Sequence, residues 1–81
     1  MTRNILVRVF DGGGRPVSGA KVSIWVYQFM ASGLAASGQT AGDGEFEADI
    51  DIDASGEISI SVNDKERVSR SSPRGSYRIE I

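Results

Sequence analysis

The sequence predicts an all-β sandwich of about seven short strands, and three observations carry that prediction. Apolar and polar residues alternate in short stretches along the whole chain, as they do in half-buried strands. Turn residues recur roughly every 8–12 positions, which is the strand spacing of a sandwich. Sustained helical periodicity is missing. With 81 residues, the chain is predicted to form one β-sandwich domain over residues 1–81.

The first two predicted strands flank a glycine-rich turn. Asn4–Phe10 alternates apolar and polar residues, and the three consecutive glycines of Asp11–Arg15 permit positive φ angles that other residues resist. Pro16 then fixes an extended backbone, and Gly19 marks a second bend before the strand Ala20–Phe29. One face of this second strand is predicted to enter the core with Ala20, Val22, Ile24 and Val26.

The middle of the chain predicts a loop, a weak strand, a tight turn and a strong strand. Met30–Gly33 is predicted as the loop and Leu34–Thr40 as the weaker strand. Ala41–Gly44 contains an Asp-Gly pair, which is typical of a β-hairpin turn. Glu45–Asp53 then alternates cleanly, so its acids are predicted outward and the following residues inward: Phe46, Ala48, Ile50 and Ile52.

The last third of the chain predicts three more strands separated by polar turns. Glu57–Val62 alternates well, Arg67–Ser71 is a poor strand suited to a sheet edge, and Ser76–Ile81 closes the chain. The residues predicted to face the core are Ile58, Ile60, Val62, Tyr77, Ile79 and Ile81.

Composition excludes several kinds of active site. The chain has no histidine and no cysteine, so the commonest general base, the commonest transition-metal ligand and the thiol nucleophile are missing. Lys21, Lys65 and the N-terminal amine could activate a serine, but nothing in the local sequence singles one out. The net charge of −2 argues against a nucleic-acid-binding surface. We expect no enzyme, no cofactor and no metal centre.

Charged residues separate into an acidic segment and a basic segment. Residues 43–57 carry acids without a basic partner, and residues 65–78 carry basic side chains against Glu66 alone. We expect the two segments to lie on neighbouring strands, where facing opposite charges contribute roughly 0.2–1 kcal/mol a pair. Strand register and solubility are their predicted role, and a charged partner is the alternative.

The cellular location is left open by the sequence. The N-terminal residues hold no signal-peptide core, because Arg8 and Asp11 interrupt the apolar run. Residues 22–42 carry no charge, but they are too polar for a membrane span, which needs about 20 predominantly apolar residues. We expect a cytoplasmic protein if the chain is complete, and a cell-surface or secreted one if it is an excised domain.

Two segments share a pattern of strand, acidic turn and strand. The first holds Val7–Val9, Asp11, the glycine turn, Arg15–Val17 and Gly19–Val22, and the second holds Thr40, Asp43, Gly44 and Phe46. Together they resemble carboxypeptidase regulatory-like domains. The resemblance implies a prealbumin-like (transthyretin-like) sandwich of seven strands, of the broader immunoglobulin-like kind. It also implies an accessory module that stabilises a neighbour, spaces domains, or binds proteins and glycans.

A catalytic relative of that fold is a weaker alternative. Arg74–Ser76 resembles part of the C-terminal tetrapeptide of transthyretin-like hydroxyisourate hydrolases. Pro73 stands where those enzymes carry a tyrosine, further residues follow, and the histidines on which they rely are missing. We interpret this segment as a turn.

The best functional hypothesis concerns the outer face of the second strand. If Val22, Ile24 and Val26 face the core, strand alternation turns the aromatic residues of that strand to the other face. Apolar residues in and beside the following loop extend this stripe. The candidate partner-binding residues are Trp25, Tyr27, Phe29, Met30 and Leu34. Such a stripe predicts self-association or a protein partner. The alternatives are sugar stacking, or a bulge or covering loop that leaves no site.

A second hypothesis concerns Asp49, Asp51 and Asp53, which share one face of a predicted strand. Calcium prefers six to eight oxygen ligands, and these carboxylates could supply some of them. The simpler interpretation is that they face arginines of the basic segment, namely Arg67, Arg70 or Arg78. The sequence therefore predicts a non-enzymatic interaction or structural module. A small ligand-, glycan- or Ca²⁺-binding domain is the alternative, and a hydrolase is the weakest one.

Overall fold

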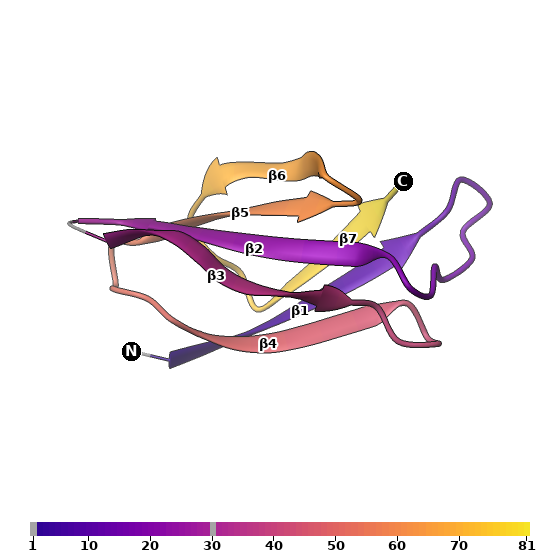
Figure 1. Ribbon diagram of the computed structural model, residues 1–81, viewed down its shortest axis with the longest axis horizontal. Helices are drawn as coiled ribbons and strands as arrows, with labels where there is room; N and C mark the ends of the chain where they lie inside the picture. The colour runs from indigo at the N-terminus through magenta and orange to yellow at the C-terminus, as the bar shows by residue number, and fades with distance from the viewer. Residues whose placement is uncertain (1, 30) are drawn as a thin grey trace.

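A computed structural model describes residues 2–29 and 31–81, and within them the chain forms two packed β-sheets without a helix (Figure 1). The strands are β1 Thr2–Phe10, β2 Lys21–Gln28, β3 Ala31–Gln39, β4 Glu45–Asp51, β5 Glu57–Val62, β6 Lys65–Ser71 and β7 Ser76–Glu80. These bounds confirm the predicted all-β class. In the described residues no helix is long and apolar enough to cross a membrane.

The strands are distributed over a three-stranded and a four-stranded sheet. The first has the order β4-β1-β7, in which β7 runs parallel to β1 and β4 antiparallel to it. The second has the order β3-β2-β5-β6, and all of its pairs are antiparallel. In Figure 1 the four-stranded sheet lies in front of the other one, with β3 beside β4 at one lateral edge and β6 at the opposite edge.

The core fills the space between the sheets and is made of branched aliphatic residues. In the strands with clean alternation the residues predicted to face inward are buried, because successive side chains of a strand point to opposite faces; Phe46, Ala48 and Ile81 are the exceptions and are only partly buried. Each fully buried side chain contributes roughly 1.5–3 kcal/mol relative to an exposed one. The buried residues are Ile5, Val7, Val9, Ala20, Val22, Ile24, Val26, Ile50, Ile52, Ile58, Ile60, Val62, Tyr77 and Ile79.

The two turn segments that carry the family resemblance meet beside β1. Asp11 closes the first turn, its Oδ1 accepting hydrogen bonds from the backbone N–H groups of Gly13 (2.9 Å) and Arg15 (3.0 Å). In the second turn Gly44 has φ +79°, and its carbonyl accepts a 2.9 Å hydrogen bond from the N–H of Val9. A Cβ on Gly44 would lie 2.8 Å from the Val9 carbonyl oxygen and 2.9 Å from Pro16 Cβ. Glycine is therefore required there by both conformation and space.

Two sequence predictions about connections are wrong. Met30–Gly33 is not a loop, because β3 begins at Ala31; Met30 itself lies outside the described residues. Ala41–Gly44 does form a tight turn, with the Gly44 N–H bonded to the Ala41 carbonyl at 2.9 Å. It does not form a hairpin, since β3 belongs to the four-stranded sheet and β4 to the other. The turn crosses between the sheets.

Candidate partner-binding face

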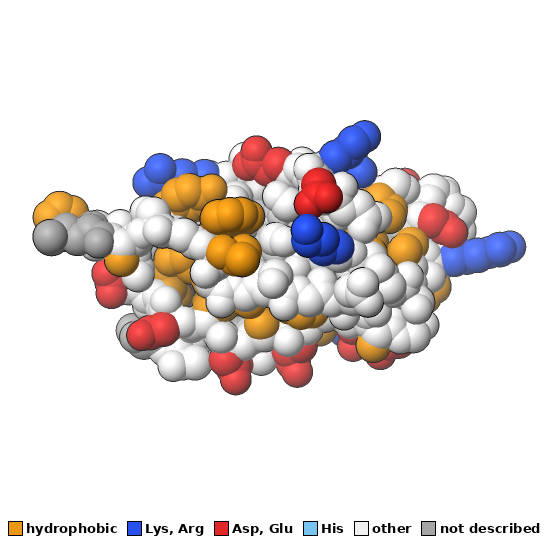
Figure 2. All heavy atoms as spheres, viewed as in Figure 1, with side chains coloured by type: hydrophobic (Ala, Val, Ile, Leu, Met, Phe, Trp, Pro, Cys, Tyr) orange, Lys and Arg blue, Asp and Glu red, His pale blue; other side chains and the backbone are white. Residues whose placement is uncertain are grey.

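The outer face of the four-stranded sheet carries the predicted aromatic residues of β2. Val22, Ile24 and Val26 are buried, so the odd-numbered positions of β2 point away from the core. Trp25 is 39% exposed there and lies opposite Leu34 of β3 and Ser59 of β5. Figure 2 views this face and shows hydrophobic side chains gathered over the middle of the sheet.

A β-bulge in β3 brings Leu34 to this face. Ile24 pairs with Ala36, and the next residue of β2, Trp25, pairs with Leu34, so Ala35 is an extra residue in the strand. Without the bulge, Leu34 would have the same inward parity as Ala36. With it, Leu34 lies next to Trp25 and is 52% exposed. We call Trp25 and Leu34 together the apolar patch.

The other predicted aromatics take different positions. Tyr27 is half-buried, its hydroxyl lies 3.1 Å from Ser59 Oγ, and the guanidinium of Arg70 stacks 4.8 Å from its ring centroid. Arg70 Nε also donates to Glu57 Oε1 at 2.8 Å. Tyr27 therefore forms a fixed border of the apolar patch. Phe29 is 87% exposed, but it follows the end of β2 and stands apart from Trp25 along the chain.

A shallow hollow of about 380 Å³ adjoins the apolar patch. It is polar at its far end, where Lys21 Nζ lies 3.3 Å from Asp64 Oδ1. Sequence reasoning missed these surroundings, because the serines and the two charged residues have no signal in the sequence other than their outward positions. The lining residues are Lys21, Ser23, Trp25, Leu34, Ser37, Ser61 and Asp64.

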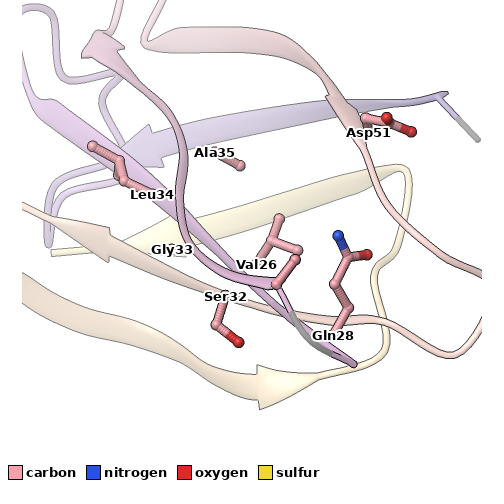
Figure 3. Close-up of a pocket in the computed structure, with 8 residues that line it drawn as sticks. Val26, Gln28, Ser32, Gly33, Leu34, Ala35 and Asp51 are labelled. Carbon is pink, nitrogen blue, oxygen red and sulfur yellow. The ribbon is translucent and has the colours of Figure 1, made fainter.

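A second hollow of about 270 Å³ opens at the lateral edge between β3 and β4 (Figure 3). Val26 and Gln28 reach it from β2, Gly33 and Leu34 border it on β3, and Asp51 lies across from them on β4. Gln28 Oε1 accepts a 2.8 Å hydrogen bond from the backbone N–H of Asp53. This hollow is likewise open to solvent, so neither of the two encloses a small molecule.

The prediction that the acids of β4 face arginines of the basic segment is wrong. β4 pairs with β1, so Asp49 accepts a 3.0 Å hydrogen bond from Asn4 Nδ2. Arg70 instead pairs with Glu57, and Arg78 stacks 3.9 Å from the ring centroid of Phe10. The reason is topological, because the crossover at Ala41–Gly44 takes β4 into the sheet that lacks β6, and β1 separates β4 from β7 in that sheet. Among the described residues, no three acids come together as a metal-binding group.

The architecture defines a β-sandwich of the prealbumin-like and immunoglobulin-like kind. The sequence matches no protein-family model and no curated protein. The chain is similar in structure to the shaft pilin spaA from Lactobacillus rhamnosus GG, in a crystal structure of a point mutant, with a TM-score of 0.69 and 14% sequence identity. The match covers 99% of this chain and 46% of the pilin chain, so this chain spans about half of that protein's length.

Proposed function

We propose that this chain is a non-enzymatic structural or accessory module that docks a protein partner through the apolar patch. The observation that carries the proposal is the pairing of Trp25 with Leu34 on an open sheet face, 39% and 52% exposed. Tryptophan is among the residues that contribute most to binding when an interface buries them. The bulge supports this interpretation, since it moves a leucine from core parity to the surface.

The surroundings of the apolar patch favour a protein over a small molecule. Ser23 and Ser37 border it, and the Lys21–Asp64 pair lies at one end, which gives an apolar centre with a polar rim. Small-molecule sites are usually concave and enclose most of the ligand. The hollow beside the apolar patch is shallow and open to solvent, so it suits a partner that covers the whole face.

A non-enzymatic role is supported by the chemistry around the hollows. The chain has neither histidine nor cysteine, and Lys21 is paired with Asp64 rather than with a serine. Transthyretin-like hydrolase activity would need groups that are missing from this sequence.

We further propose that the chain is a divergent carboxypeptidase regulatory-like domain. Three of the residues that carry the resemblance have clear structural roles, since Asp11 closes a turn, Thr40 bonds two segments of backbone, and Gly44 fits where no Cβ can. Residues of this kind determine the fold. The partner is determined by other residues, on the outer face of the sheet.

The docking proposal is tested by selecting peptides from a random display library on the wild-type protein. The enriched peptides are then measured, without any counter-selection, on a Trp25→Ser/Leu34→Ser double variant. We expect enriched peptides rich in apolar and aromatic residues that bind the double variant at least about tenfold more weakly, a difference of about 1.4 kcal/mol. A Phe29→Ser variant is the matched control, because it removes an exposed aromatic outside the apolar patch.

Two results would contradict the docking proposal. One is that all enriched peptides bind the double variant as well as the wild type. The other is that only a glycan array gives binding that depends on Trp25, which would make the patch a sugar-stacking site.

A further inference from the structure

The two lateral edges of the sandwich carry opposite charge. At one edge β3 lies beside β4, whose outward side chains are acidic: Glu45, Glu47, Asp49 and Asp51. The opposite edge, formed by β6, β7 and the turn between them, carries two acids, Glu66 and Glu80, and a larger number of basic residues: Lys65, Arg67, Arg70, Arg74 and Arg78. Figure 2 shows acids along the lower margin near β4, whereas the upper margin near β6 carries lysine and arginine together with acids. We call these the acidic side and the basic side.

The charges of the two sides are separated within one molecule. Arg8 reaches one acid of β4, with its Nε 2.9 Å from Glu45 Oε2, and the neutral Asn4 faces Asp49. The sequence predicted that the acidic and basic segments would face each other on neighbouring strands; this holds for Glu57 and Arg70, on β5 and β6, whereas the topology places the acids of β4 at the edge opposite β6. Complementary charge is therefore available between molecules.

The edge of β3 is open to strand addition. In the part of the chain that the structure describes, no strand pairs with its outer edge. β3 carries no charged residue and no proline, whereas the other edge strands carry charges along their length. Charged side chains and proline are the usual devices that keep an edge from pairing with another chain. Backbone N–H and C=O groups of β3 are thus accessible to a partner strand.

We propose that the partner strand is β6 of a second copy of this chain, so that copies join side by side with the acidic side of one against the basic side of the next. The charges of β6 oppose its pairing with another β6, but they complement the acidic side that lies next to the uncharged β3. The four-stranded sheets then form one continuous sheet, and β4 of one copy lies beside β7 of its neighbour. This contact is heterologous, so it repeats into a row rather than closing into a dimer. Every copy in the row presents its apolar patch on the same face.

Symmetric pairing is disfavoured by the same charges. If two β3 strands paired across a two-fold axis, two acidic β4 strands would come together. If two β6 strands paired in the same way, their basic residues would come together. Like charges that face each other are destabilising. The bulge at Ala35 leaves two short regular stretches in β3, so the pairing is limited in length. We therefore expect a weak association that depends on concentration and salt.

Contact through the lateral edges is independent of the proposed function of the apolar patch. The test is sedimentation velocity of the wild-type protein over a wide concentration range, from about 0.01 M to about 1 M NaCl, where the Debye length falls from about 30 Å to about 3 Å. Side-by-side rows weaken as salt rises. A symmetric β3 dimer strengthens, because salt screens the repulsion between its acids.

Charge-reversal variants sharpen the test. Glu47→Lys/Asp49→Lys cancels the net negative charge of the acidic side, and Lys65→Glu/Arg67→Glu removes the net positive charge of the basic side. Each variant alone is expected to associate at least about fivefold more weakly than wild type at low salt. An equal mixture of the two is expected to associate again as pairs, because the unchanged basic side of the first variant complements the unchanged acidic side of the second. Circular dichroism verifies that each variant folds. If the first variant fails to fold, Glu47→Gln replaces it, and if the second fails, Lys65→Gln replaces it.

Three results would overturn the inference: a protein that stays monomeric at all concentrations, association that strengthens with salt, or a mixture that associates no better than its components. The Trp25→Ser/Leu34→Ser variant separates the two proposals, because row formation is expected to survive in it while peptide binding is lost. If that variant no longer forms rows, the apolar patch and not the lateral edge is the contact between copies.

Discussion

Replacement of the buried Thr40 by valine should lower the free energy of unfolding, although the two side chains have nearly the same size and shape. Thr40 is 5% exposed, and its Oγ1 accepts a 2.9 Å hydrogen bond from the Ala20 N–H while donating to the Val17 carbonyl. Its backbone pairs with the same segment, through Gly19 and Ala20. One hydroxyl thus ties the end of β3 to the chain that leads into β2.

The expected loss follows from the two groups left without partners. Valine keeps the shape of threonine but removes the hydroxyl, so a buried N–H and a partly buried C=O lose their hydrogen bonds. An unsatisfied buried group costs roughly 1–3 kcal/mol, which suggests a loss of about 2–3 kcal/mol for Thr40→Val. For a domain of this size that is a fall in Tm of roughly 10–20 °C.

The assay is urea unfolding followed by far-UV circular dichroism, with Thr40→Ser as the matched control. Serine keeps Oγ and loses only a methyl group, which costs about 1 kcal/mol. We expect the valine variant to be the less stable of the two. If Thr40→Val is as stable as Thr40→Ser or more so, the hydroxyl does not hold these two backbone groups.

Three further predictions use the same unfolding assay. Gly44→Ala is expected to lower the free energy of unfolding by more than about 3 kcal/mol, because a positive φ is combined with a close approach to Val9. Gly14→Ala, at φ +81° in open space, should lower it by only about 1–2 kcal/mol. Equal losses would contradict the argument that Gly44 is crowded. Tyr77→Phe removes the hydroxyl that accepts a 2.7 Å hydrogen bond from the Arg74 N–H, for a loss of about 1 kcal/mol, and an unchanged stability would deny that bond a role. Leu34→Ser should change the free energy of unfolding by less than about 1 kcal/mol, and a larger loss would place this side chain in the core.

The fold could be predicted from local sequence patterns because its strands alternate strongly. Ile58, Ile60 and Val62 identify their strand and its buried face without further information, and the same holds for Ile5, Val7 and Val9. The three glycines after Asp11 likewise identify a turn.

The pairing of strands could not be predicted in the same way. The Asp-Gly turn after Thr40 gives the same sequence signal whether the next strand stays in the sheet or crosses to the other one. Which sheet β4 joins depends on non-local packing of its inward residues. The predicted contacts between Asp49 and the arginines therefore failed, although every one of these residues was assigned to a strand.

The candidate face was predicted in part. The parity of β2 placed Trp25 on the outer face, but the sequence Leu-Ala-Ala at 34–36 does not show which residue is extra in the strand. The bulge decides that Leu34 joins Trp25. The partial burial of Tyr27 could not be foreseen either, since it depends on Ser59 and Arg70 from other strands.

The central claim is that the apolar patch is the docking surface, and NMR chemical-shift mapping tests it most directly. A ¹⁵N-labelled sample is titrated with a peptide obtained from the display selection. If the patch is the docking surface, the largest shifts occur at Ser23, Trp25, Leu34 and Ser37, with the Trp25 indole N–H among them. Shifts concentrated elsewhere, with the Trp25 and Leu34 signals unmoved at saturation, would contradict it.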